Sequence, residues 1–256
     1  NFNFPVNQHK RYWISQYSKI KIPLPPLRFQ KEIVAEIEGY QKIINGARSI
    51  VDNYKSHIQI DPVWKMEKLG EVCDVRDGTH DSPKYQANGY PLITSKNLKD
   101  GDIDFKKVNF INEEDYRNIG KRSSVENGDV LFAMIGTIGN PVVVNTDKKF
   151  SIKNVALFKF YDNDKLLSLY LKTLLDSKYT YERLIVKSRG GTQKFVSLTD
   201  LRNFIIPVPS IETQKEIVTQ IEKEQSLINA NRELIILFEQ KIKDKIANVW
   251  GERAKV

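Results

Sequence analysis

Cysteine and histidine are scarce in this chain, and their scarcity excludes several kinds of site. The single cysteine, Cys73, cannot form an internal disulfide, so a reducing cytoplasm is the expected compartment. The three histidines, His9, His57 and His80, are scattered and have no metal-type spacing to one another or to the cysteine. We therefore expect no metal site, and we expect each histidine to be a surface or polar-contact residue.

Long apolar runs and the signatures of several enzyme classes are also missing. No stretch of about 18 apolar residues occurs, which argues against a membrane-spanning helix. The GTIGN run at 136–140 is too short for a phosphate-binding GxxxxGK[ST] loop and lacks its lysine. No Asn-Pro-Pro-aromatic or Asp-Pro-Pro-aromatic motif of amino-methylating enzymes is found, and the pairs Asp104/Lys106 and Asp147/Lys149 lack the second carboxylate of a nuclease motif. The sequence therefore favours binding over catalysis.

Acidic residues are outnumbered by basic ones. The chain has 40 Lys and Arg against 32 Asp and Glu, which gives a formal net charge of +8. Such a balance favours a polyanionic partner, because Lys and Arg gain affinity when they release counterions from phosphates. The alternative is that the charge only keeps the protein in solution. Charge alone therefore places nucleic acid modestly ahead of other partners.

The most informative feature of the sequence is an internal repeat. IPLPPLRFQKEIVAEIE at 22–38 returns as IPVPSIETQKEIVTQIE at 206–222, with 10 of 17 aligned residues identical. Each copy opens with prolines, which end the preceding element, and then runs into helical sequence. The repeat extends backwards, since 12–23 aligns with 196–207. We interpret residues 1–21 as the tail of a preceding α/β module.

Both copies continue into long helices with heptad rows of residues, unbroken and apolar in the first copy and interrupted by Glu224, Asn231 and Lys245 in the second. The first row comprises Ile33, Ile37, Tyr40, Ile44, Ala47, Val51, Tyr54 and Ile58, and the second comprises Ile217, Ile221, Glu224, Ile228, Asn231, Ile235, Phe238, Ile242, Lys245 and Val249. Antiparallel pairing of the two helices within the chain is the simplest way to cover these rows. We expect the interface to be formed by Ile33, Ile37, Tyr40, Ile44, Val51, Ile221, Ile228, Ile235 and Ile242. In the alternative interpretation the second helix is merely amphipathic, with Leu227, Leu234 and Leu237 widening its apolar face.

The segment between the two helices has a different character. Short β-like runs bounded by Gly, Asp and Asn occur at 90–95, 106–111, 129–136, 141–146 and 155–161, and residues 166–185 have helical spacing. These patterns predict an α+β protein, in which a mixed α/β domain is flanked by two long helices that pair as an antiparallel coiled coil.

Two polar stretches in this middle domain are candidates for binding nucleic acid. VRDGTHDSPKY at 75–85 contains turn-forming pairs and leads to ITSKNL at 93–98, while KSRGGTQKF at 187–195 contains a Gly-Gly pair that lets backbone N–H groups approach an anion. Compact polar side chains here can contact base edges or phosphates. The expected DNA-binding residues are Arg76, Thr79, His80, Ser82, Lys84, Ser95, Lys96, Asn97, Lys187, Arg189, Gly190, Gly191, Thr192, Gln193 and Lys194. Taken singly, each stretch can equally be an ordinary solvated turn.

Several sequence stretches, spread over nearly the whole chain, carry a resemblance to a known family. They are Trp64 with LGEV at 69–72, RDGTHDSPKY with GYPLITSKNL, ENGDVLFAMIGTIGN at 126–140, SRGGTQKFVSL at 188–198 and IPVPSIETQKEIV. Together they make the chain similar to the specificity subunits of type I restriction–modification enzymes. The resemblance implies a tail of a preceding module at 1–21, a proline joint and spacer helix at 22–59, a target recognition domain at 60–207, and a second joint and helix at 208–256.

The resemblance also implies a function and partners. A prokaryotic, non-catalytic subunit of this kind reads half of a bipartite site in double-stranded DNA and docks adenine methyltransferase subunits, with motor-nuclease restriction subunits in some complexes. The cofactor S-adenosylmethionine is then expected in the methyltransferase partner and none in this chain. Family members usually have two recognition domains, whereas this chain has one and a 21-residue stub. It can therefore be the C-terminal half of a subunit, a half-subunit that self-associates through its long helices, or the specificity tail of a methyltransferase fusion.

Two other classes of function remain open at this stage. The chain can itself be a nuclease or methyltransferase, which cleavage or methyl transfer by the isolated chain would reveal. It can also be a coiled-coil interaction module without DNA specificity. DNA binding that is unaffected by changing Arg189 and Lys194 to Ala would favour that last alternative.

Overall fold

The computed structural model describes residues 24–161, 165–186 and 194–251, and the chain divides into two compact units. The helical unit holds the chain up to Asn53 together with Ile228 onward. The α/β unit runs from Tyr54 to Leu227. Helix α8, Ile211–Gly251, contributes residues to both units.

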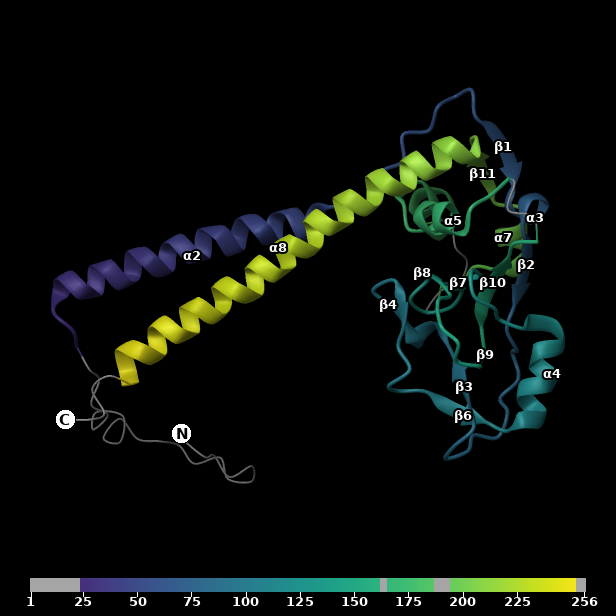
Figure 1. Cartoon of the computed structure of the whole chain (residues 1–256), viewed down its shortest axis with the longest axis horizontal. Coiled ribbons are helices and arrows are strands. Elements are labelled where there is room, and N and C mark those ends of the chain that lie inside the picture. The colour runs from purple at the N-terminus through teal and green to yellow at the C-terminus, as the bar shows by residue number, and fades with distance from the viewer. Residues whose placement is uncertain (1–23, 162–164, 187–193, 252–256) are drawn as a thin grey trace. The chain divides into compact units, whose positions relative to one another are not determined.

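The helical unit is a pair of antiparallel helices, α2 (Leu27–Asn53) and the later part of α8 (Figure 1). The ring of Tyr40 lies against that of Phe238, with 5.2 Å between centroids. One turn earlier in α2, the Glu36 carboxylate pairs with Lys245 Nζ at 2.5 Å. The residue number of the partner rises as the number along α2 falls, as it must in an antiparallel pair.

Burial along the helices follows the predicted heptad rows. On α2, Ile44 is buried and Ile33, Ile37, Tyr40 and Val51 are half-buried; on α8, Ile228 is buried and Ile221, Ile235 and Ile242 are half-buried. The alternative of a widened apolar face does not hold, because Leu227, Leu234 and Leu237 expose 66%, 39% and 49% of their surface. The predicted fold class, a mixed domain with two paired long helices, is confirmed.

The end of the first heptad row was predicted wrongly. Helix α2 ends at Asn53, so Tyr54 and Ile58 lie beyond it. Ile58 is buried in the core of the α/β unit, and the Tyr54 hydroxyl donates to Glu224 at 2.9 Å. The apolar spacing continues past the end of α2 because Tyr54 and Ile58 make their contacts within the α/β unit.

The α/β unit contains short elements. In chain order they are β1 (Lys65–Lys68), α3 (Leu69–Val72), β2 (Asp74–Asp77), β3 (Tyr90–Ile93), the 3₁₀ turn η1 (Ser95–Asn97), β4 (Leu98–Lys99), β5 (Asp102–Ile103), β6 (Asn109–Ile111), α4 (Glu113–Ser123), β7 (Val130–Ala133), β8 (Gly139–Val143), β9 (Ser151–Ile152), β10 (Val155–Lys159), α5 (Ser168–Leu175), α6 (Lys178–Thr180), the π-helical turn η2 (Tyr181–Ile185), α7 (Leu198–Arg202) and β11 (Ile205–Val208). The central sheet is antiparallel with order β2-β10-β7-β8, beside a three-stranded sheet of order β6-β3-β9 and two short pairs, β1-β11 and β4-β5.

The central sheet is buried on both faces. Val130 and Phe132 of β7 belong to one core cluster, which includes residues of α5 and α7, whereas Leu131 and Ala133 belong to a second cluster with residues of β3 and β9. Strands covered on both sides read as continuous apolar runs, as VLFA and VALFK do in this sequence. Pro141 fits β8 because that strand lies at the edge of the sheet.

Most predicted elements of the middle domain are present, though shorter. The runs at 90–95, 106–111, 129–136, 141–146 and 155–161 contain all or part of β3, β6, β7, β8 and β10. The helix predicted at 166–185 is interrupted after Leu175 instead of continuing. The hydroxyls of Ser177 and Thr180 both donate to the Leu174 carbonyl, at 2.6 and 2.7 Å, and so replace helical backbone bonds at this break.

The two units divide inside α8 and not at the proline joint before it. The first turns of α8 belong to the α/β unit because Val218 is buried in its core and the Gln214 side chain is fully buried. Gln214 accepts from the Leu167 amide at 2.9 Å and donates to the carbonyls of Lys165 at 2.7 Å and Pro209 at 3.0 Å. The first copy of the repeat has the same local bond, since Gln30 donates to the Pro25 carbonyl at 2.7 Å.

We predict that Ile44→Asp separates the paired helices and leaves the α/β unit folded. Ile44 is 1% exposed, so an unpaired carboxylate there should cost roughly 3 kcal/mol or more. The measurements are helix content by circular dichroism and amide hydrogen exchange in the α/β unit. Ile43→Asp is the matched control, because the neighbouring residue is 41% exposed and should tolerate the charge. Loss of protection throughout the α/β unit in Ile44→Asp alone would show that the two units do not fold separately.

Candidate nucleic-acid interface

The first polar stretch leaves β2 as a loop pressed against β9. A Cβ atom added to Gly78 would lie 2.2 Å from the Ile152 carbonyl oxygen, so glycine is required at this close approach. Three backbone bonds fix the loop: Gly78 N–H to Val155 O at 3.0 Å, Thr79 N–H to Ile152 O at 3.0 Å, and Asn154 N–H to Thr79 O at 3.2 Å. The loop is therefore ordered by the sheet before any partner binds.

The two parts of this region that were predicted to act together meet at Asn154. The two ring nitrogens of His80 lie 2.8 Å from Asp77 Oδ2 and 2.8 Å from Asn154 Oδ1. Ser95, from the second part, donates its hydroxyl to the Asn154 carbonyl at 3.4 Å. Asp77 is buried and also pairs with Arg122 of α4. The structure thus places the segments 75–85 and 93–98 on one surface with α4.

Other predicted contact residues are accessible on this surface. Ser82, Lys84 and Lys96 are exposed, and Thr79 is half-buried. The Ser82 hydroxyl accepts a bond from Lys153 Nζ at 2.6 Å. Their side chains present donors and acceptors of the kind that contact phosphates and base edges.

Asn97 occupies a different position from the one expected. Its side chain is buried, with Oδ1 accepting from the amide and hydroxyl of Thr94 and Nδ2 donating to the carbonyls of Asp104 and Lys107, all at 2.9–3.0 Å. The amide is fully used in holding the η1 turn against the strands that follow. This placement argues against a contact between Asn97 and a base.

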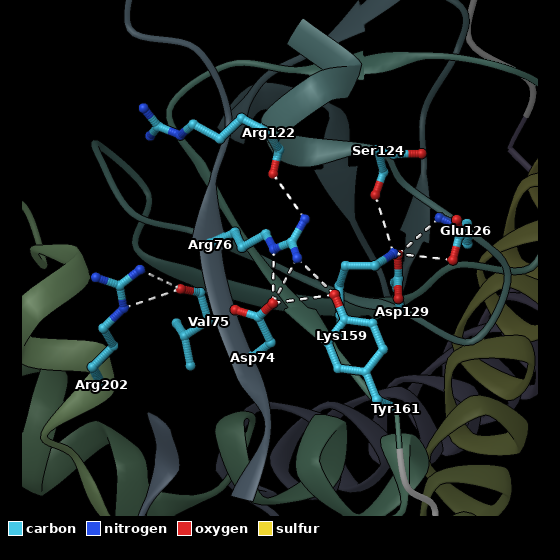
Figure 2. A network of polar contacts seen from close by, with 10 residues as sticks. All are labelled: Asp74, Val75, Arg76, Arg122, Ser124, Glu126, Asp129, Lys159, Tyr161 and Arg202. Carbon is cyan, nitrogen blue, oxygen red and sulfur yellow. Dashed lines mark hydrogen bonds and ion pairs between the residues drawn. The ribbon is translucent and has the colours of Figure 1, made fainter. Parts of the chain in front are cut away.

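Arg76 is also committed to bonds within the protein (Figure 2). Its guanidinium donates to Asp74 Oδ2 at 2.8 Å, to the Tyr161 hydroxyl at 2.7 Å and to the Arg122 carbonyl at 3.0 Å. The last bond satisfies a carbonyl at the C-terminal end of α4, where helix carbonyls lack partners within the helix. Arg76 therefore anchors α4 to β2.

Lys159, the last residue of β10, provides the next anchor (Figure 2). Its buried ammonium lies 2.8 Å from Asp129 Oδ2, 3.2 Å from Glu126 Oε2 and 3.1 Å from the Ser124 carbonyl oxygen. Burial alone would lower the pKa of Lys159, but the bonds to the two carboxylates outweigh it and raise the pKa above the ordinary value. The cation holds the segment that follows α4 against the central sheet.

Helix α4 was not predicted, although the sequence contains its signals. Asn112 caps the helix by accepting from the Asp115 amide at 2.7 Å, and acidic residues fill the first turn. Lys121 and Arg122 lie in the last turn, where positive charge is favourable. The cap and this charge order would have identified α4 and, with it, the basic residues Lys121 and Arg122 at its C-terminal end.

The second polar stretch falls only partly within the described residues. Lys187, Arg189, Gly190, Gly191, Thr192 and Gln193 lie outside the described residues. Lys194 is exposed, and its carbonyl accepts from the Gly136 amide at 3.3 Å. Phe195 forms a bridge with Ile135, so this end of the stretch lies beside the β7–β8 connection.

The described residues show few features of a catalytic centre. Among them, no group of three or more His, Cys, Asp and Glu side chains is placed to hold a metal ion. Burial raises the pKa of the Cys73 thiol, which keeps it protonated and poorly nucleophilic. Within the same residues, none of the helices has the length and apolarity needed to cross a bilayer.

Comparison with known proteins shows the family to which the chain belongs. Residues 63–239 match the family model of the type I restriction modification DNA specificity domain, and the chain belongs to that family. It is 25% identical to the type I restriction enzyme MjaVIII specificity subunit of Methanocaldococcus jannaschii, over 91% of this chain and 61% of that protein. It is 28% identical to the EcoBI specificity subunit of Escherichia coli, over 68% of this chain and 37% of that protein.

Solved structures show the same fold. The HsdS subunit of Thermoanaerobacter tengcongensis aligns with a TM-score of 0.53 and 20% identity, over 89% of this chain and 59% of that one. A structure of a type I R-M system, described for its complex assembly and conformational transition, aligns with a TM-score of 0.55 and 21% identity, over 88% of this chain and 60% of that one. The chain thus spans about 60% or less of the length of these relatives.

We predict that Lys159→Met destabilises the α/β unit by roughly 3–5 kcal/mol, because Asp129 is left as a buried carboxylate without its cation. Urea denaturation followed by near-ultraviolet circular dichroism measures the change. Lys178→Met is the control, since its ion pair with Glu182 is exposed and should contribute about 1 kcal/mol or less. Asp129→Asn, added to Lys159→Met, should recover part of the loss. Equal costs for the two lysine variants would contradict the anchoring role of Lys159.

Proposed function

We propose that this chain is a DNA-recognition part of a type I restriction–modification enzyme and reads one half of a bipartite site in double-stranded DNA. The observation that carries the proposal is the family match over residues 63–239, which covers most of the α/β unit and its polar surface. The net charge of +8 supports a polyanionic partner. The ordered loop around Gly78 supports a surface that reads its partner without first folding.

The chain itself supplies no catalytic group in this proposal. An adenine methyltransferase subunit binds S-adenosylmethionine and transfers the methyl group, and a motor-nuclease restriction subunit joins in a restricting complex. The exposed faces of the helical unit dock the methyltransferase, and they also permit self-association with a second copy. Its exposed apolar side chains, such as Ile43, Ile50 and Leu234, support a docking role.

Affinity and specificity are carried by different side chains. Long cations such as Lys84 and Lys96 bind phosphates, which strengthens binding to every sequence. Short polar groups on the fixed loop, such as Thr79 and Ser82, contact base edges and distinguish one sequence from another, while His80, whose two ring nitrogens bond to Asp77 and Asn154, holds the loop.

The proposal is tested by selecting from a random duplex library with the chain and its methyltransferase partner, at several salt concentrations. We expect one preferred sequence and a binding constant that falls steeply with salt, by about 0.9 logarithmic units per phosphate contact for each tenfold rise in salt. Binding without sequence preference, binding insensitive to salt, or methyl transfer or cleavage by the isolated chain would each overturn the proposal.

We further predict that Lys84→Gln and Lys96→Gln weaken DNA binding severalfold, because each removes an exposed cation beside the ordered loop. Lys31→Gln is the matched control, since it removes an exposed cation of α2 in the helical unit. Fluorescence anisotropy with the preferred duplex gives the three dissociation constants. An equal loss in Lys31→Gln would mean that net charge, and not this surface, determines affinity.

A further inference from the structure

Two hollows lie next to each other along β2 and α4. The first, here the basic hollow, has a volume of about 680 Å³, and the cations that line it are Arg76, Lys121, Arg122 and Arg202. The second, here the polar hollow, has a volume of about 290 Å³ and lies between the loop after β2 and α4. Arg122 lines both, so the two hollows adjoin at its side chain, and together they are called the groove here.

The basic hollow carries an excess of positive charge. Its lining contains four cations and two carboxylates, Asp74 and Asp77. Arg76 and Arg122 pair with these carboxylates. Arg202 donates instead to the Val75 carbonyl at 2.8 and 3.1 Å, and Lys121 donates to the Asn118 amide oxygen at 2.9 Å (Figure 2 shows Arg202). Both of these acceptors are neutral, so the charges of Arg202 and Lys121 remain available to an anion.

The polar hollow has a different chemistry. Thr79 and Ser82 line it from the ordered loop, and Asn118 faces them from α4. These are neutral donors and acceptors on short side chains, accompanied by the carboxylates of Asp81 and Asp115. A site of this size lies at the lower limit of small-molecule sites, which suits one nucleotide at most.

We propose that this groove binds one DNA strand, with a backbone phosphate in the basic hollow and the adjoining nucleotide contacted by its base edge in the polar hollow. The inference rests on the proposed function and assigns to it Lys121, Arg122, Arg202 and Asn118, which the sequence patterns did not indicate. Guanidinium groups present paired N–H donors that match the oxygens of a phosphate. Arg122, shared by the hollows and held by Asp77, sets the distance between the phosphate and the base.

The phosphate half of the proposal is tested with Lys121→Gln and Arg202→Gln. Each should weaken binding roughly tenfold, both to the preferred duplex and to a scrambled one, and should reduce the salt slope by about 1. Lys106→Gln is the control, because it removes an exposed cation of the same unit that lines neither hollow. Thermal denaturation of each variant confirms that it is folded, and Lys121→Gln is informative even if Arg202→Gln loses stability with its Val75 bond.

The base half is tested with Ser82→Ala. It should reduce the preference for the selected duplex over the scrambled one by roughly tenfold, since a hydrogen-bonded contact to a base edge discriminates against the wrong base, and should leave the salt slope unchanged. Lys121 and Arg202 variants that behave like Lys106→Gln overturn the groove but leave the proposed function intact. A wild-type chain that binds duplexes without any sequence preference overturns both.

Discussion

The fold depends on the buried side chain of Gln214, which connects the start of α8 to the α/β unit. Its amide makes three bonds, two of them to residues just before α5 and one to the Pro209 carbonyl in the joint. A buried amide with all these partners fixes the first turns of α8 against the α/β unit. Gln30 makes the equivalent bond to Pro25 at the start of α2. The repeated segments that run from a proline to a glutamine, Pro25–Gln30 and Pro209–Gln214, are therefore two copies of one structural joint.

A second constraint decides where polar groups of the α/β unit lie. Because β10 is buried along its whole length and sits between β2 and β7, water is excluded from both of its faces. Charged side chains are then confined to the margin of the sheet: Lys159 and Asp74 pair at one end of β10 and β2, and Arg76, half-buried on the edge strand β2, donates to Asp74. The anchors of α4 and the groove beside it follow from this confinement, since a buried cation must find carboxylates and carbonyls close by.

Local patterns explain what could be predicted from the sequence. The paired helices and the strands β7 and β10 follow from periodicity and from apolar runs, which depend on near neighbours only. Helix α4 was missed because its apolar content is low, although its cap and charge order are local signals. The role of Asn97 could not be predicted, because its partners Asp104 and Lys107 lie later in the chain. The pairing of β4 with β5 brings that part of the chain back beside Asn97. Arg122 and Arg202 could not be placed in one groove for the same reason.

The rigidity of the loop after β2 bears on which side chains of such a recognition surface give specificity and which give affinity. Gly78 holds the backbone against β9 by close contact, and Asn154, which has a positive φ of 54°, bonds to the His80 ring. Short side chains on such a backbone lose little entropy on binding, so their contacts with bases can discriminate between sequences. Long side chains such as Lys84 and Lys96 keep many rotamers and suit phosphates, whose positions hardly vary with sequence. In the proposed function, the separation of specificity from affinity therefore follows from backbone rigidity and side-chain length, with the reading of DNA assigned to the loop and the strength of binding to the cations around it.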